Sequence, residues 1–128
     1  MEEQDIWAKK KVCIVDDDAD LREIYSMTFN REGFDVVLAT DGEEGLKMIR
    51  AERPDIILLD LHMPVKNGIE VLEELDHDKE LSKIPVIVLS NIDHEEAFKK
   101  VGEFETRFYL IKSLNSPQKV VDYVREVL

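Results

Sequence analysis

Several polar side chains in this sequence directly follow short apolar runs, and their types suit phosphoryl transfer. Two adjacent carboxylates offer oxygen ligands to a hard divalent cation, and an isolated carboxylate can act as a nucleophile toward phosphorus. A hydroxyl and an ammonium can bind the oxygens of the transferred group. The residues are Asp16 and Asp17 after Val12–Val15, Asp60 after Ile56–Leu59, Ser90 after Val86–Leu89, and Lys112 after Phe108–Ile111.

These apolar runs alternate with helical patterns along the chain, which predicts five βα units. Runs that are apolar on both faces are typical of parallel strands covered by helices on two sides. The sequence therefore predicts an α/β fold with a five-stranded parallel sheet and five helices. The predicted strands are 12–15, 34–39, 55–60, 86–89 and 108–111. The predicted helices include one over Asp93–Glu103 and one that begins at Pro117, with Ser116 as its N-cap.

The carboxyl ends of parallel strands meet at one edge of a sheet, where open α/β sheets place their sites. We therefore expect the polar residues to converge at that edge. Asp16, Asp17 and Asp60 would raise one another's pKa values unless a cation compensated their charge, and Mg²⁺ is the simplest such cation. Asp18 and Asp41 are expected to cap the helices that follow them, and residues 63–68 are expected to form a loop and turn.

Composition restricts the classes of function. The 128 residues include 17 basic and 29 acidic side chains, a net charge of -12 that argues against direct nucleic-acid binding. No apolar stretch approaches the ~20 residues that span a bilayer, so no membrane association is expected. The single Cys13 reads as a core residue of a protein in the reducing cytoplasm. Residues 1–10 are expected to form an N-terminal extension to one domain over 11–128.

Four segments together resemble the receiver domain of two-component response regulators, the chemotaxis-type fold. The resemblance covers roughly Lys11 to Leu128 and implies the doubly wound, flavodoxin-like strand order 2-1-3-4-5. It rests on the run of residues 12–18, on 55–64 followed by Asn67-Gly68, on 85–90 and on 109–112.

By that resemblance, Asp60 accepts a phosphoryl group from a histidine kinase or phosphotransfer protein. Asp16, Asp17, Asp60 and the backbone carbonyl of His62 would bind Mg²⁺. Ser90 and Lys112 would bind the phosphoryl group, with Ser90 and Tyr109 as the switch pair. Phosphorylation would then change the surface of the fourth helix, fifth strand and fifth helix, which controls a downstream protein or output domain. Such a chain is a signalling phosphoacceptor rather than a metabolic enzyme. Homodimers are common in the family, although no feature here selects one.

The sequence departs from the family pattern at a few positions. Ser113 follows Lys112 where a proline, often after a cis peptide, is usual; the loop is then either rebuilt or strained. Asn91 replaces a small residue after the switch hydroxyl. His62 and Ile92 flank the expected path of the attacking water; apolar Ile92 predicts a longer-lived acyl phosphate, unless His62 instead orients the water. Phe104 and Phe108 are either partner contacts or core side chains.

Three other functions fit parts of the pattern. A Mg²⁺-dependent phosphatase of the haloacid-dehalogenase type would use Asp16 and Asp18, but it expects Asp-Gly-Thr soon after and leaves Asp60 unexplained. A flavodoxin-like binding module would have Ser, Thr or Gly after Val15 rather than three acids. A receiver fold used purely as a scaffold would not need Asp60 and Lys112.

Overall fold

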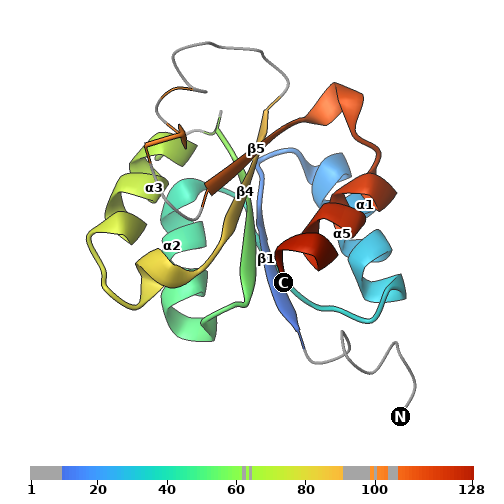
Figure 1. The fold of residues 1–128 in the computed structure, drawn as a ribbon, viewed down its shortest axis with the longest axis horizontal. Coiled ribbons are helices and arrows are strands. Elements are labelled where there is room, and N and C mark those ends of the chain that lie inside the picture. The colour runs from blue at the N-terminus through green and yellow to red at the C-terminus, as the bar shows by residue number, and fades with distance from the viewer. Residues whose placement is uncertain (1–9, 62, 64, 91–98, 100, 104–106) are drawn as a thin grey trace.

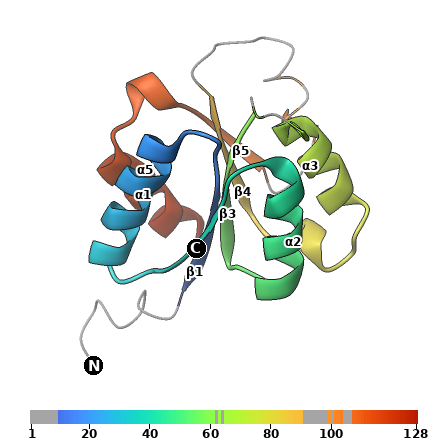
Figure 2. The same cartoon turned by 180° about the vertical axis from the view of Figure 1, so that it is seen from behind.

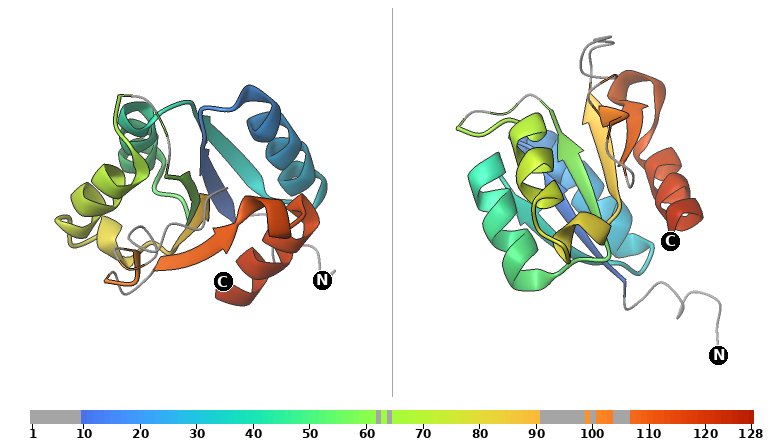
Figure 3. Two further views of the ribbon diagram at one scale, coloured as in Figure 1. Left: turned by 90° about the horizontal axis from the view of Figure 1, so that it is seen from above. Right: turned by 60° about the vertical axis from the view of Figure 1, so that its left-hand side comes forward.

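The computed structural model describes residues 10–61, 63, 65–90, 99, 101–103 and 107–128. Its five strands form one parallel sheet in the order β2-β1-β3-β4-β5, as predicted. Figure 1 shows this sheet between two layers of helices, and the right-hand view of Figure 3 shows strand arrowheads that point toward the same edge. The strands are β1 (Lys11–Val15), β2 (Asp35–Ala39), β3 (Ile56–Asp60), β4 (Val86–Ser90) and β5 (Arg107–Ile111).

The helices cover both faces of the sheet, as the apolar strands require. Helices α1 (Ala19–Arg31) and α5 (Pro117–Val127) lie on one face, and α2 (Gly42–Glu52) and α3 (Gly68–Asp76) lie on the other (Figures 1 and 2). Short 3₁₀ turns span Leu81–Lys83 and Lys112–Leu114. Of the helix predicted over 93–103, Lys99 and Val101 are helical, and residues 93–98 and 100 lie outside the described part of the chain.

Each face of the sheet carries its own apolar core. All five residues of β3 and of β4 are buried, which explains why their sequences lack the polar alternation of a half-exposed strand. Cys13 is fully buried in the core beneath α2 and α3, and burial raises the pKa of its thiol to about 12. No helix among the described residues combines the length and apolar character needed to cross a bilayer.

The helix starts are fixed by side chains at the edge where the strands end. Asp18, Asp41 and Ser116 accept backbone N–H groups of α1, α2 and α5, as their positions predict. Asn67 was expected in a turn, but it caps α3 in a reciprocal capping box with Glu70. The caps therefore set where each helix begins relative to the polar residues at the strand ends.

Two predicted strands begin one residue later than the sequence pattern suggested. Phe34 precedes β2, where its N–H donates to the Phe29 carbonyl and its ring packs edge-on against Phe29 at 5.1 Å. Asp55 precedes β3, where its carboxylate accepts the backbone N–H of Lys11 at 2.7 Å. Phe34 therefore contacts the end of α1 and Asp55 the start of β1, and neither residue extends the sheet.

Candidate functional site

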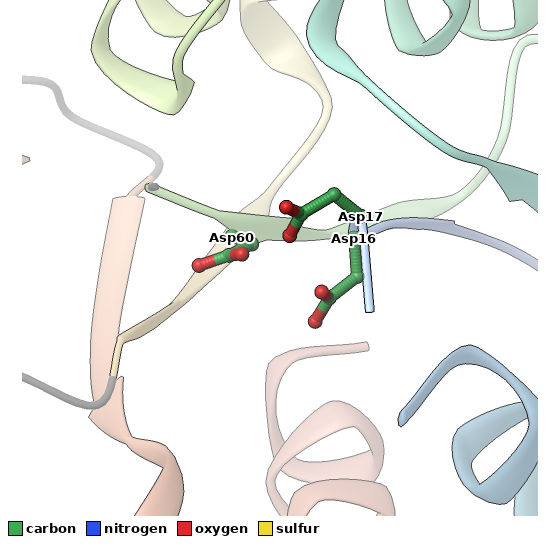
Figure 4. A group of neighbouring side chains, drawn as sticks. All are labelled: Asp16, Asp17 and Asp60. Atoms are coloured by element: carbon green, nitrogen blue, oxygen red, sulfur yellow. The ribbon is translucent and has the colours of Figure 1, made fainter. Parts of the chain in front are cut away.

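Three aspartates gather at the carboxyl edge of the sheet. Asp16 follows β1, Asp17 comes next, and Asp60 ends the neighbouring β3; Figure 4 shows these side chains in one group. Each offers a carboxylate oxygen within 4.8 Å of the others. Asp16 and Asp60 are buried, with 2% and 7% exposure, whereas Asp17 is exposed. Such a set of hard oxygen donors, open to solvent on one side, fits a Mg²⁺ ion that retains water ligands.

Lys112 brings a positive charge from β5 to these carboxylates. Its Nζ lies 2.8 Å from Asp16 Oδ2 and 3.6 Å from Asp60 Oδ1, and its side chain is only 8% exposed. Attraction between unlike charges is strong at such distances because little water separates them. One ammonium does not balance three carboxylates, so an excess of negative charge remains to attract a cation.

Ser113 is accommodated by a rebuilt loop. No peptide bond among the described residues is cis, and Lys112–Leu114 forms a 3₁₀ turn between β5 and α5. Asn115 supports this turn through a hydrogen bond from its Nδ2 to the Ile111 carbonyl at 2.9 Å. Of the two outcomes expected without the usual proline, a rebuilt loop and a strained loop, the structure shows the rebuilt loop. A trans peptide bond and a short turn place Lys112 beside the acidic residues.

Ser90 ends β4 beside the acid cluster. The sheet pairs Asp60 with Leu89 and Ser90 with Ile111, which places Ser90 between the ends of β3 and β5. Ser90 is fully buried, and Tyr109 is half-buried against the core beneath α2 and α3. The expected positions His62, Asn91, Ile92 and Phe104 lie outside the described residues.

Hydrogen bonds from the chain orient Asp16. Its Oδ1 accepts the N–H of Asp18 at 3.0 Å, and its backbone carbonyl accepts a bond from Arg22 Nη1 at 2.8 Å. Asp18 Oδ1 accepts the N–H groups of Asp20 and Leu21, which confirms its predicted role as a helix cap. A phosphatase of the haloacid-dehalogenase type would use Asp16 and Asp18 together, but here Asp18 is engaged in capping α1.

Tyr25 of α1 was not among the residues expected near the acid cluster. The structure buries this residue, and burial raises the pKa of its phenol, with a smaller contribution from the negative charges of Asp16 and Asp60. The negative charges of the acid cluster therefore act on a residue in the core below it. Helical spacing gives no signal for such a long-range contact.

Comparisons with known proteins identify a family and a set of relatives. The family model described as the response regulator receiver domain matches residues 12–125. The chain is 37% identical over 120 residues to the alkaline phosphatase synthesis transcriptional regulatory protein PhoP of Bacillus subtilis, which is 93% of this chain and 48% of that protein. It is 36% identical over 125 residues to the probable transcriptional regulator ycf27 of Guillardia theta, covering 97% and 47%. The chain thus spans about half the length of these curated relatives.

Solved structures show the same fold. The chemotaxis response regulator CheY4 of Vibrio cholerae has a TM-score of 0.84 and 27% identity, and the match covers 93% of this chain and 98% of that one. The Francisella response regulator 1452 receiver domain has a TM-score of 0.81 and 30% identity, covering 93% and 96%.

Proposed function

Because the chain belongs to the response regulator receiver domain family, we propose that it is the phosphoacceptor switch of a two-component system. A histidine kinase or a phosphotransfer protein donates the phosphoryl group, and Asp60 accepts it. The observation that carries this proposal is the position of Lys112, whose Nζ lies between two buried strand-end carboxylates, Asp16 and Asp60. A cation held so close to an acceptor carboxylate can neutralise the oxygens of an incoming phosphoryl group.

The transfer is a displacement at phosphorus. An oxygen of the Asp60 carboxylate forms a bond to the phosphorus of a phosphohistidine, the P–N bond breaks, and its electron pair returns to the imidazole nitrogen. The product is an acyl phosphate on Asp60. Lys112 would pair with the phosphoryl oxygens and Ser90 would donate its hydroxyl to one of them.

The aspartates give the site its metal affinity. Asp16, Asp17 and Asp60 would hold Mg²⁺, together with the His62 carbonyl implied by the family pattern. When bound, Mg²⁺ supplies positive charge that offsets the carboxylates and the phosphoryl oxygens. The metal-free cluster, by contrast, repels an anionic phosphodonor.

Output follows from a shift between two conformations. The phosphoryl group would draw Ser90 toward it, and Tyr109 would turn inward into the space released. This pair biases the equilibrium only through contacts that differ between the two states. The affected surface includes an apolar groove of about 180 Å³ between β5 and α5, whose lining includes Phe108 and Tyr123, both more than 40% exposed.

A downstream protein or output domain would bind this surface in the cytoplasm. The relatives named above are transcriptional regulators of about twice this length. A net charge of -12 makes direct binding of the receiver to DNA unfavourable. We therefore propose that residues 11–128 act through protein contacts, with residues 1–10 as an extension.

The test is incubation with Mg²⁺ and acetyl phosphate, followed by intact mass measurement. The expected result is a gain of one phosphoryl group that requires Mg²⁺. Asp60→Asn keeps the size of the side chain but removes the nucleophile, so it should gain none. Reduction of the acyl phosphate with borohydride, followed by peptide mapping, should then identify residue 60 as the phosphorylated position.

Two results would contradict the proposal. The first is an unlabelled wild-type protein that melts as one folded domain. The second is a label that persists in Asp60→Asn, which would move the acceptor elsewhere, for example to Asp16 as the phosphatase reading requires.

A further inference from the structure

The loop between Asp60 and α3 is closed at its base against the backbone of the acceptor residue. Gly68 donates its N–H to the Leu61 carbonyl at 3.0 Å. A Cβ added to Gly68 would lie 2.6 Å from the Asp60 carbonyl oxygen and 2.8 Å from Leu61 Cα, so no larger residue fits this approach. The start of α3 therefore packs directly on Asp60 and Leu61, so a displacement of Gly68 reaches residue 60 with little intervening structure.

Within this loop, Val65 has a strained backbone. Its φ is 68°, in the left-handed region that β-branched residues rarely adopt. Its side chain is 78% exposed, so packing offsets little of the strain. Strain of this kind persists only where the surroundings hold it, and it gathers at functional sites.

The neighbouring Lys66 supplies such a hold. Its Nζ pairs with Glu74 of α3 and lies 3.7 Å from Glu43 Oε2 of α2, and its side chain is only 22% exposed. Its backbone carbonyl also packs so closely on Gly42 that a Cβ there would collide with it. These contacts fix Lys66, the residue after Val65, to both helices on this face of the sheet.

We propose that Lys66 is a positioning residue for the acid cluster: its ion pairs to Glu74 and Glu43 hold Val65 in its strained conformation and so keep the start of α3 packed on Asp60, which sets the arrangement of Asp60 for metal binding. The inference rests on the proposed function, because it concerns the same Mg²⁺ site. It predicts that a residue remote from the cation controls the affinity for it.

A cycle of variants tests the proposal. Lys66→Met removes the charge but keeps the length, Lys66→Arg keeps the charge, and Val65→Gly removes the strain with little loss of packing. The matched control is Lys11→Met, since Lys11 forms a similarly exposed pair with Glu52 at 3.0 Å, at the opposite end of β1 from the acid cluster.

Two readouts apply to each variant. Calorimetric titration gives the Mg²⁺ dissociation constant, and hydrogen exchange of the Gly68 amide in EDTA reports loop closure without metal. In Lys66→Met the dissociation constant and the exchange rate should each rise roughly twofold to fivefold, the range that partly exposed ion pairs supply. Lys66→Arg should restore both values. In the Val65→Gly background Lys66→Met should change neither the dissociation constant nor the exchange rate, because glycine adopts the left-handed conformation without the Lys66 ion pairs.

The outcomes separate this inference from the proposed function. A wild-type protein that neither binds Mg²⁺ nor accepts a phosphoryl group overturns the proposed function. A functional wild type whose Lys66→Met variant binds Mg²⁺ unchanged overturns the positioning role, even where its melting temperature falls as in Lys11→Met. If Lys66→Met weakened Mg²⁺ binding equally with and without Val65→Gly, the Lys66 ion pairs would not act by holding Val65 in its strained conformation.

Discussion

Asp60 is expected to destabilise the metal-free protein, and Asp60→Asn should therefore raise its stability. At an effective dielectric of about 20, unlike charges 3.6 Å apart attract by about 5 kcal/mol, as for Lys112 and Asp60. Like charges 4.8 Å apart, the upper limit for the Asp60 and Asp16 oxygens, repel by about 3.5 kcal/mol. Asp17 adds a smaller, solvent-screened repulsion because it is exposed.

Attraction and repulsion thus nearly cancel, and desolvation decides the sign. Taking a carboxylate out of water costs several kcal/mol, of which hydrogen bonds return a part. Asparagine retains hydrogen-bonding capacity at position 60, and Lys112 retains its 2.8 Å pair with Asp16. We expect Asp60→Asn to add about 1–3 kcal/mol to the free energy of unfolding in EDTA, a rise of at least about 3 °C in melting temperature.

The assay is thermal unfolding by circular dichroism at pH 7, in EDTA and then in Mg²⁺. Mg²⁺ should stabilise the wild type more than Asp60→Asn and so reduce the difference between them. Asp78→Asn is the matched control, because the pKa of Asp78 is lowered by hydrogen bonds from the backbone of Leu81 and Glu80, and this substitution should gain nothing. A lower melting temperature for Asp60→Asn in EDTA would refute the reasoning, since it would show that the charge of Asp60 is net favourable.

Two further changes test the charge and the core. Lys112→Met should lower the free energy of unfolding in EDTA by about 3–5 kcal/mol, because two buried carboxylates lose their ammonium. Added Mg²⁺ should recover part of this loss in calorimetry, and an unchanged melting profile in EDTA would contradict the pairing. Cys13 should react with a thiol reagent only in denaturant, since burial raises its pKa from 9.0 to about 12. The folded protein then keeps a proton that the unfolded chain releases, so the contribution of this group to stability is complete below pH 9.0 and declines as the pH rises toward about 12.

The placement of the site was predictable because strand burial and topology follow from simple patterns. The uninterrupted apolar runs of β3 and β4 indicated strands buried on both faces, and all their residues are buried. Parallel strands with helical crossovers then bring Asp60 and Ser90 to one edge. The strand order came from the family resemblance, since periodicity alone does not say which strands are neighbours.

The loop geometry was not predictable from the same patterns. Met63 through Gly68 read as a loop and turn, yet Asn67 caps α3 and Val65 adopts a positive φ that turn rules assign to glycine or asparagine. Lys66 pairs with Glu74 and Glu43, which are too far away in the sequence for a local rule to select. Such contacts depend on how two helices pack, and spacing along one element does not encode that.

Two features of the metal-free site therefore oppose the stability of the fold that carries it. The acid cluster holds more negative charge than Lys112 balances, and the adjoining loop holds Val65 in a strained conformation. A cation or a phosphoryl group changes a conformational equilibrium only through interactions that differ between the two states. Unbalanced charge would provide such a difference, because Mg²⁺ bound as proposed would lower the energy of the clustered arrangement far more than that of an open one. A site with all its charges paired internally would be more stable, but the same ligands would then have less influence on it.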